Sequence, residues 1–404
     1  MSNYSNEIIN LKKKYVANNY EQIPIVVAEA KGVWIRDPEG NQYLDMIGGG
    51  STMTCGHRHP KIIDALKSQA DKVTFSSNML YNDQLVPFSK KLTEMTGKDM
   101  IIPMNTGTEA VETAIKCARR WAYNIKNVPE NEAEVIVCAG NYHGFTITLS
   151  SFSTNEKCFK DFGPFTPGFN IIPFGDIDAL KKSISPNTAA FLVEPIQYHA
   201  GIILPPAGFL KKAFDCCQGN NVLFIADEVQ MGLGRTGRLF ACDWEDIEPD
   251  IYVLGKPLGG GVLPVSAVVA NSEILQVFDP GSNYTAFGGN PLACAVAKAT
   301  LEVIEKENLP QRADNLGRYL LNKLSNIENP DIKEVRGKGL LVVIEFYSHV
   351  AQYYCEALRK ECVLVGQVGE DILRFTPPLI ITKEELDWAL KKIVKVIAKN
   401  SELL

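Results

Sequence analysis

Residues 251–265 read Ile-Tyr-Val-Leu-Gly-Lys-Pro-Leu-Gly-Gly-Gly-Val-Leu-Pro-Val, and this stretch decides how the fold is interpreted. An apolar, β-branched run ends at Gly255, and Lys256 follows it before a proline and three glycines. The pattern predicts a buried strand that delivers Lys256 into a tight loop. A desolvated lysine loses its proton readily and can form a Schiff base with an aldehyde. A surface lysine in a glycine-rich turn would leave the same pattern, so the rest of the chain has to distinguish the two.

Similar apolar runs lie before and after this stretch. They predict strands over 135–140, 189–196, 222–228, 251–255 and 265–270, with helices over 108–124 and 209–220. Short, almost continuous apolar strands that alternate with helices are typical of an α/β fold, in which a mostly parallel sheet is covered on both faces. Ligands of such sheets bind beyond the carboxyl ends of the strands.

The two ends of the chain are organised differently. Residues 1–20 are expected to form a polar helical arm, and the turn at 37–40 indicates a β-hairpin. Residues 59–73 carry one apolar helix face. Near the other end, 334–346 reads as a strand, and a final helix is predicted from Lys383.

At 404 residues the chain exceeds one ordinary core, so we predict two domains. Residues 61–300 are expected to form the larger one, which would bind the ligand. Residues 1–60 supply the N-terminal arm and part of a smaller α+β domain, which is completed by residues 301–404.

Composition narrows the class of protein. The chain is 46% hydrophobic and 22% charged, as in an ordinary globular protein. Its formal net charge of −6 and the lack of a basic stripe argue against a nucleic-acid partner. The first residues lack the apolar core of a secretory signal, and no apolar run approaches the roughly 18 residues of a membrane span. The ten cysteines are scattered without metal-binding spacing, so we expect no metal, reduced thiols and a cytoplasmic location.

Two segments at predicted strand ends suit a flat anionic ligand. Residues 104–109 form a glycine-containing turn into a helix, whose free backbone N–H groups suit an anion, although an ordinary helix cap has the same pattern. In 139–144, Tyr142 stands between glycines and is placed either to cover a ring or simply to pack in the turn.

Two further segments add a carboxylate and an amine. Asp227 and Glu228 end an apolar strand, where a buried carboxylate needs a cationic or hydrogen-bonding partner unless it only caps a helix. Lys256 supplies the amine. An anion cradle, a flat aromatic, a carboxylate and an amine, in that order, meet the needs of pyridoxal phosphate (PLP), which requires a Schiff-base lysine and a carboxylate at its ring nitrogen.

Long motifs from about residue 20 to the C-terminus carry a family resemblance. They are PMNTGTEAVETAIKCARRW, GNYHGFTITLSSFST, FGPFTPGFNIIPF, AFLVEPIQ, VLFIADEVQMGLGRTGR, DIYVLGKPLGGGVLPVSAV, FGGNPLACAVA, VRGKGLL and ILRFTPPL. The chain resembles the class III aminotransferases, which are fold-type I PLP enzymes, and among them most closely the ornithine aminotransferases. The resemblance implies PLP as cofactor, and a large, mostly parallel α/β domain beside a smaller one built from both chain ends.

The resemblance also implies roles for individual residues. Lys256 would form the Schiff base and later move the proton at the substrate carbon, while Asp227 would pair with the pyridine nitrogen. Further cofactor contacts would come from Val229 and Tyr142 on the two ring faces, Gln230 at the phenolic oxygen, and Gly107 and Thr108 at the phosphate.

Two more implications concern the substrate and the assembly. Arg374 matches the arginine that binds a substrate α-carboxylate, a task suited to its bidentate fork. In this family the active site lies at a dimer interface, where the segment before Phe287 reaches the neighbour's phosphate. We therefore expect a homodimer with C2 symmetry.

Some positions depart from the ornithine enzymes. Those enzymes carry a tyrosine at the position of Gly50, an arginine at that of Phe145 and a glutamate at that of His199. Their phosphate threonine corresponds to Ala286, which leaves Thr285 as a substitute. The missing arginine and glutamate belong to a switch that lets the family alternate between ornithine and 2-oxoglutarate, so ornithine is not expected as a substrate.

We therefore predict an aminotransferase with a ping-pong cycle between an amino acid and a keto acid or aldehyde. Arg374 would hold the α-carboxylate of a substrate with an uncharged or aromatic side chain, in a pocket shaped by Phe145, Tyr198 and the space at Gly50. The alternative is an amino-acid racemase or epimerase, which needs a single carboxylate site and a second acid/base such as His199 or Tyr198.

Two other classes are less compatible with the sequence. A non-catalytic scaffolding relative would not need to retain Lys256, Asp227, Gln230 and Arg374. A nicotinamide-binding domain would need a GxGxxG turn after an early strand, and the sequence has none there.

Overall fold

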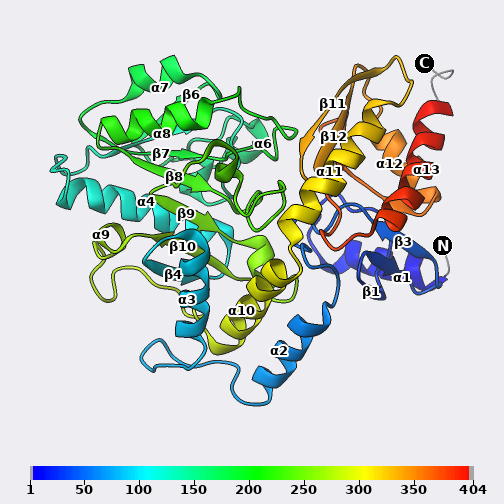
Figure 1. Cartoon of the computed structure of the whole chain (residues 1–404), viewed down its shortest axis with the longest axis horizontal. Coiled ribbons are helices and arrows are strands. Elements are labelled where there is room, and N and C mark those ends of the chain that lie inside the picture. Colours follow the sequence, from blue (N-terminus) through cyan, green and yellow to red (C-terminus); the bar gives the residue numbers. More distant parts are fainter. Residues whose placement is uncertain (1–2, 400–404) are drawn as a thin grey trace.

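The computed structural model describes residues 3–399 of the chain. Figure 1 shows a larger body built around a central sheet and, beside it, a smaller body that contains both ends of the described chain. The two ends meet because β13 (Val363–Leu364) pairs in parallel with β3 (Gln42–Asp45). The proposed domain boundaries near residues 60 and 300 remain a prediction.

The central sheet has seven strands. In spatial order they are β4 (Met100–Met104), β10 (Ser266–Ala270), β9 (Ile251–Leu254), β8 (Leu223–Asp227), β7 (Thr188–Val193), β5 (Glu134–Cys138) and β6 (Phe169–Ile172). All strands but β10 run in one direction, which confirms the predicted mostly parallel sheet. The five predicted strands are present, whereas the edge strands β4 and β6 are additional to the prediction.

The reversed direction of β10 follows from the connection that precedes it. Residues 255–265 separate β9 from β10, and this segment contains only the short 3-10 helix η2 (Lys256–Gly259). A parallel neighbour requires a crossover of a dozen or more residues, usually with an α-helix that crosses the sheet. A short connection therefore returns the chain antiparallel to β9.

Each strand of the sheet contributes to two cores, because successive side chains point to opposite faces. In β5, Val135 packs on the side of α4 (Gly107–Asn124), while Ile136 packs on the side of α8 (Phe209–Gly219). α4 packs across β7, β9 and β10. The sheet is thus buried on both faces, which is why its strands read as continuous apolar runs.

α4 begins at a capping box. The Thr106 hydroxyl accepts from the backbone N–H of Glu109 at 3.2 Å, and the Glu109 carboxylate accepts from the N–H of Thr106 at 2.8 Å. This arrangement satisfies two N–H groups that a helix start otherwise leaves unpaired. It confirms the predicted helix and fixes the turn that follows β4.

The smaller body contains two four-stranded sheets. The first joins β1 (Glu29–Lys31), β2 (Trp34–Arg36), β3 and β13, and the second has the order β11 (Ile332–Lys338), β12 (Leu341–Phe346), β15 (Ile372–Phe375), β14 (Gly366–Val368). The predicted hairpin at 37–40 is confirmed, since β2 and β3 are antiparallel across it. The single strand predicted over 334–346 is wrong, because the chain turns at Gly339 and forms the antiparallel pair β11–β12.

Helices surround these sheets. The remaining ones are α1 (Asn3–Tyr15), α2 (Pro60–Ala70), α3 (Leu85–Thr96), α5 (Ile147–Ser150), α6 (Glu156–Phe159), α7 (Ile177–Ser183), α9 (Ser272–Leu275), α10 (Pro291–Lys306), α11 (Leu309–Ser325), α12 (Ala351–Lys360), α13 (Lys383–Lys399) and the 3-10 helix η1 (Ala241–Glu245). The predicted arm thus contains α1, although its first two residues lie outside the described range. The final helix begins at Lys383 as predicted.

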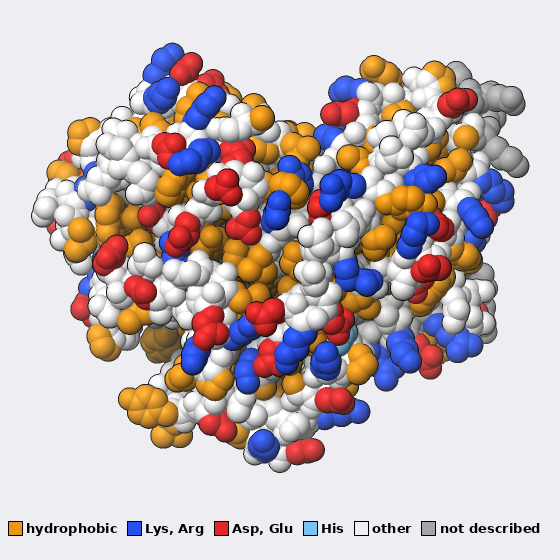
Figure 2. Space-filling model, in the orientation of Figure 1, with side chains coloured by type: hydrophobic (Ala, Val, Ile, Leu, Met, Phe, Trp, Pro, Cys, Tyr) orange, Lys and Arg blue, Asp and Glu red, His pale blue; other side chains and the backbone are white. Residues whose placement is uncertain are grey.

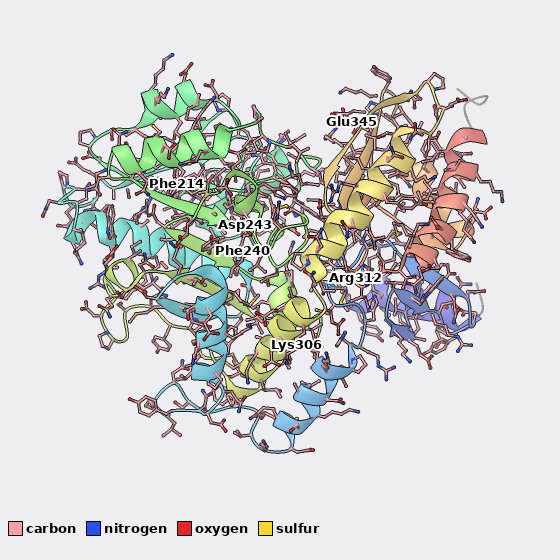
Figure 3. All side chains as sticks on the ribbon, viewed as in Figure 1. Phe214, Phe240, Asp243, Lys306, Arg312 and Glu345 are labelled. Atoms are coloured by element: carbon pink, nitrogen blue, oxygen red, sulfur yellow. The ribbon has the colours of Figure 1, made fainter. Side chains whose placement is uncertain are left out.

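α10 and α11 carry the chain from the larger body to the smaller one (Figure 1). Arg312, labelled near the start of α11 in Figure 3, donates to the carbonyl oxygens of Ile380 and Ile381 at 3.0 Å each. A helix at the joint is therefore tied to the segment just after β15. Cationic and anionic side chains are interspersed on the face shown in Figure 2. Within residues 3–399, no helix has the length and apolar character required to cross a bilayer.

Candidate active site

The carboxyl edge of the central sheet collects most of the predicted site residues. β8 ends at Asp227, β9 delivers Lys256, and the capped start of α4 follows β4. The loops after β5 and β7 carry Tyr142 and Tyr198 to the same edge. Parallel strands bring their carboxyl ends together, so residues far apart in sequence become neighbours.

Lys256 occupies a strained position. It is the first residue of η2 and has φ +35°, a conformation that costs a non-glycine residue on the order of 1 kcal/mol and that persists mainly at functional sites. Burial lowers the pKa of its ammonium to about 8; the Arg374 charge adds to this effect, while Asp227 and Glu194 oppose it. At pH 7 roughly a tenth of the amine is then neutral and nucleophilic, compared with far less for an ordinary lysine.

A cavity of about 370 Å³ lies between Lys256 and the start of α4. It is lined by Thr52, Asn105, Thr106, Gly107, Lys256 and residues 261–265. The helix start offers backbone N–H groups and the positive end of the helix dipole, which favour an anion. The cavity therefore combines an amine with an anion site.

Val229 and two glycines pack tightly beside this cavity. A Cβ atom on Gly107 would lie 2.9 Å from Cγ1 of Val229, and one on Gly255 would lie 3.3 Å from the same atom. Only glycine at position 107 lets the helix start approach Val229 this closely. Thr108 follows in the first turn of α4, with its hydroxyl against the backbone of Gly144.

Asp227 is buried and held at both oxygens. One oxygen is 2.6 Å from Nδ1 of His143, and the other accepts from the N–H of Val229 at 3.1 Å. Burial alone lowers the pKa of His143, but its hydrogen bond to Asp227 and the nearby negative charge raise it overall. His143 was not among the residues predicted from the sequence, although it directly follows Tyr142 in the glycine-bounded turn.

Gln230 presents an unsatisfied amide. Its side chain is 6% exposed, and neither its Nε2 nor its Oε1 has a hydrogen-bond partner within the described part of the chain. Buried amides nearly always have partners, so these atoms fit a ligand that supplies a polar oxygen. Together with Asp227 and Lys256, Gln230 provides a donor set that suits PLP.

Arg374 lies on the other side of the site, on β15. Its guanidinium carbon is 4.2 Å from the ring centre of Tyr198, and Nζ of Lys256 is 5.5 Å from that ring. Among the residues that the structure describes, Arg374 forms no ion pair with a carboxylate, and its Nε has no partner. It is therefore available to an anionic ligand.

His199 stands beside Tyr142 rather than beside an acid. The two ring centres are 3.8 Å apart and the rings are tilted by 40°. Burial, and then the charges of Lys256 and Arg374, lowers the pKa of His199 to about 3. The residue still has an exposed surface, and the lowered pKa favours the neutral imidazole at physiological pH.

Tyr198 borders the space at Gly50, and Phe145 lies at the surface beside Tyr142. A Cβ atom on Gly50 would lie 3.8 Å from the hydroxyl of Tyr198, which is ordinary contact, so this phenol forms one wall of the space predicted at Gly50. The hydroxyl is buried and has no partner in the described chain. Phe145 is 68% exposed and touches the edge of Tyr142, with ring centres 5.1 Å apart.

Thr285 does not lie beside Lys256 within the described chain. Its hydroxyl accepts from the amide of Asn105 at 2.9 Å and donates to Glu109 at 3.2 Å. Ala286 beside it is exposed. Thr285 therefore lies behind the start of α4, next to the cavity rather than in its wall.

Glu194, at the end of β7, joins two loops of the site and was also missed. One of its carboxylate oxygens accepts from the N–H of Tyr142 at 2.9 Å and the other from the N–H of Tyr198 at 3.4 Å. Burial raises its pKa to about 7. A carboxylate directly after an apolar strand is the signal that identified Asp227, and it would have identified Glu194 as well.

A larger cavity of about 960 Å³ lies on the side of the smaller body. Residues 18–24, Ile47, parts of α12 and residues 364–367 line it. Gly366 in its wall pairs with Arg374, and a Cβ atom there would lie 3.4 Å from Nε of Arg374. This cavity therefore lies directly behind the arginine.

Comparisons with known proteins agree with this arrangement. The family model described as aminotransferase class-III matches residues 15–397. An ornithine aminotransferase from Geobacillus sp. is 56% identical over 392 residues, which cover 97% of this chain and 98% of the relative.

Solved structures are similar over almost the whole chain. An ornithine aminotransferase from Toxoplasma gondii, with PLP at partial occupancy in its active site, has a TM-score of 0.97 at 42% identity, covering 99% of this chain and 95% of that one. An acetylornithine aminotransferase from Elizabethkingia anophelis has a TM-score of 0.90 at 43% identity, covering 98% and 99%.

Proposed function

The chain belongs to the class III aminotransferases and is a PLP-dependent enzyme, and from this premise we propose how its residues divide the reaction. We propose a ping-pong cycle, in which one substrate leaves its amino group on the enzyme and a keto acid or aldehyde later takes it. PLP, when bound, supplies the carbon that carries the amino group and a ring that withdraws electrons from the substrate carbon. Small-molecule amino donors and acceptors are thus its proposed partners.

Three side chains are proposed to act on the cofactor. Lys256 is the amine that holds it and later moves the proton at the substrate carbon, which its lowered pKa of about 8 supports. Asp227, hydrogen-bonded to His143, pairs with the pyridine nitrogen. Gln230 directs its unsatisfied amide to the phenolic oxygen.

The remaining cofactor contacts use the start of α4 and two ring faces. The backbone N–H groups of Gly107 and Thr108 hold the phosphate, where the helix dipole favours negative charge. Val229 and Tyr142 cover the two faces of the pyridine ring. In a dimer, Thr285 would reach the phosphate of the partner subunit, which is the role that the family resemblance implies for its segment.

We propose that Arg374 binds the α-carboxylate of the substrate. The observation that carries this proposal is its guanidinium, which has no carboxylate partner in the described chain and lies 4.2 Å from the ring centre of Tyr198, while Nζ of Lys256 lies 5.5 Å from the same centre. The neutral imidazole of His199 nearby does not compete for it. An arginine fork suits a carboxylate because it donates two parallel hydrogen bonds.

We further propose that the substrate is an α-amino acid with an uncharged or aromatic side chain rather than ornithine. Aromatic rings of Tyr142, Phe145 and Tyr198 and the neutral His199 surround the space before Arg374. No cationic side chain stands at position 145 to hold a second carboxylate. Relatives at 56% identity are named ornithine aminotransferases, so ornithine is the substrate against which this proposal has to be tested.

A racemase or epimerase remains the second candidate. The unpartnered hydroxyl of Tyr198, whose ring centre lies 5.5 Å from Nζ of Lys256, favours it, because racemisation needs a second acid/base. His199 suits that role less, since its low pKa makes it a weak base.

We also propose a homodimer. Met79, Leu80 and Tyr81 are strongly exposed, and nearby Phe75 packs on exposed Phe287 with ring centres 4.8 Å apart. Such a contiguous apolar surface marks an interface, and light scattering of the purified protein would test it. A cytoplasmic location is proposed as well, because all ten cysteines are free.

The test of the proposed function is a single-turnover reaction of the PLP-loaded enzyme with individual amino acids. Loss of the cofactor's visible absorbance with release of the keto acid would establish the first half-reaction and identify the donor. Exchange of the α-hydrogen for deuterium without keto acid would instead favour the racemase.

A further inference from the structure

One cross-strand row of the C-terminal sheet carries two arginines. Arg336 on β11 lies opposite Val343 on β12, and Val343 lies opposite Arg374 on β15. Residues directly opposite each other on neighbouring strands point to the same face of a sheet. Arg336 and Arg374 therefore project from one face, and Val343 between them packs in a cluster with Tyr198 and Ile202 of the larger body.

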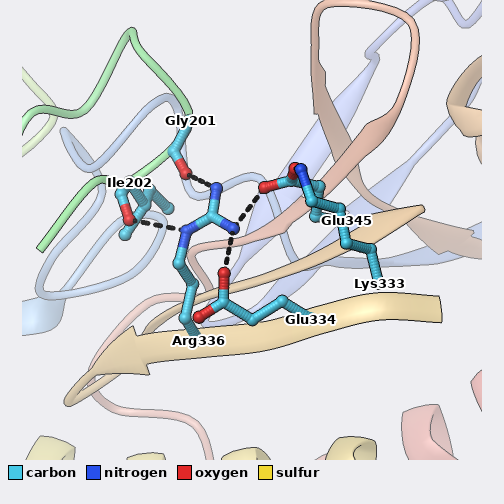
Figure 4. A network of polar contacts seen from close by, with 6 residues as sticks. All are labelled: Gly201, Ile202, Lys333, Glu334, Arg336 and Glu345. Carbon is cyan, nitrogen blue, oxygen red and sulfur yellow. Dashed lines mark hydrogen bonds and ion pairs between the residues drawn. The ribbon is translucent and has the colours of Figure 1, made fainter. Parts of the chain in front are cut away.

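Arg336 reaches from this face to the loop after β7 (Figure 4). Its Nη2 donates to the carbonyl oxygen of Gly201 at 2.6 Å, and its Nε donates to that of Ile202 at 3.1 Å. Its Nη1 pairs with Glu334 at 2.9 Å and with Glu345. The side chain is almost fully buried, and the two carboxylates balance its charge.

The loop that Arg336 holds is closed at its base by two backbone hydrogen bonds between Gln197 and Ile203, at 3.1 and 3.0 Å, but it is strained at its tip. Ile202 has φ +54°, which is unfavourable for a β-branched residue, and Gly201 has φ +105°. The N–H groups of both residues donate to the carbonyl oxygen of Tyr198, at the long distances of 3.3 and 3.4 Å. The two donors of Arg336 therefore add hydrogen bonds at this strained tip that the turn does not make by itself.

We propose that Arg336 is a positioning residue for substrate binding. It fixes the turn at Gly201 and Ile202 to the sheet face that bears Arg374, and so sets Tyr198 and His199 relative to Arg374. The expected effect on substrate binding rests on the proposed function, whereas the effect of Arg336 on the conformation of the loop does not.

The contact can be tested with three variants of the PLP-loaded enzyme. Arg336→Gln removes the donors to both carbonyl oxygens. Arg336→Lys keeps a cation beside Glu345 but cannot serve two carbonyl oxygens and two carboxylates at once. Lys333→Gln is the matched control, because Lys333 also pairs with Glu345 but does not touch the loop.

Two readouts separate positioning from general damage. Hydrogen–deuterium exchange of residues 198–203 reports the loop without any substrate. The half-saturating concentration and maximal rate of the single-turnover reaction, measured with L-phenylalanine and with L-ornithine, report the substrate side. The visible absorbance of the cofactor shows whether PLP is still bound.

For Arg336→Gln we expect faster exchange in 198–203 and a half-saturating concentration raised by about tenfold, with a smaller change in maximal rate and PLP retained. Lys333→Gln should change neither readout. Unchanged exchange and unchanged half-saturation in Arg336→Gln would overturn the proposal; if that variant does not fold, the same comparison is made with Arg336→Lys. If neither amino acid reacts with the wild type, the proposed substrate is wrong. Hydrogen–deuterium exchange of residues 198–203 then still tests whether Arg336 holds the loop.

Discussion

Substitution of His199 by glutamate probes the availability of Arg374 most sharply. In the structure Arg374 has no carboxylate partner in the described chain, and burial, followed by the nearby charges of Lys256 and Arg374, lowers the pKa of His199. The same positive field that disfavours a protonated imidazole favours a carboxylate at this position. A glutamate there should pair with Arg374 and compete with the α-carboxylate of the substrate.

The size of the effect follows from exposure. A fully exposed ion pair contributes roughly 0.2–1 kcal/mol, and a charged hydrogen bond in a buried site about 1.5–3 kcal/mol. Arg374 is partly buried and position 199 is exposed on one side, so we expect about 1–2 kcal/mol. This corresponds to roughly a 5- to 30-fold increase in the half-saturating concentration of an α-amino acid.

The assay is the single-turnover reaction of His199→Glu with L-phenylalanine, followed by the cofactor's visible absorbance. His199→Gln is the matched control, because it has a similar length but no charge. We expect the control to stay within about threefold of the wild type. Equal half-saturation in the two variants would refute the idea that Arg374 is a free carboxylate site.

Three further predictions concern the cofactor and stability. Lys256→Ala should keep its circular dichroism spectrum but lose turnover and the cofactor's visible absorbance; turnover near the wild-type rate would remove Lys256 from its proposed role. Gly107→Ala would place a Cβ 2.9 Å from Val229, so we expect a loss of about 1–3 kcal/mol in the free energy of unfolding and weaker PLP binding; an unchanged melting temperature and cofactor affinity would contradict the packing argument. Burial raises the pKa of Glu194 from 4.5 to about 7. Between these two pH values the folded state keeps a proton on Glu194 that the unfolded chain has lost, so the free energy of unfolding should fall as pH rises from about 4.5 to about 7. Glu194→Gln should reduce this pH dependence of the melting temperature, and an unchanged pH dependence would show that another group causes it.

Much of the larger body could be predicted from sequence because its strands are buried on both faces. Continuous apolar runs located β5, β7, β8, β9 and β10. The edge strands β4 and β6 were not predicted, because each pairs with a neighbour on one side only and keeps partly exposed residues. Pro103 in β4 also weakens the strand signal, although an edge strand tolerates it.

The site was predictable where one residue type at a strand end carries the chemistry, as for Lys256 and Asp227. The contacts that support these residues could not be predicted from the sequence. The hydrogen bond of His143 to Asp227, and those of Glu194 to two loops, depend on the orientation of side chains in the folded protein. The phenol of Tyr198 beside Gly50 depends on the docking of two distant segments, which a linear pattern does not encode.

We propose that this class III aminotransferase binds, through Arg374, an α-amino acid with an uncharged or aromatic side chain rather than ornithine. The most direct measurement is the single-turnover rate of the PLP-loaded enzyme with L-ornithine beside L-phenylalanine and other neutral amino acids. We expect fast loss of the cofactor's visible absorbance with a neutral or aromatic amino acid and little loss with ornithine. Efficient reaction with ornithine, releasing its semialdehyde, would contradict this proposal.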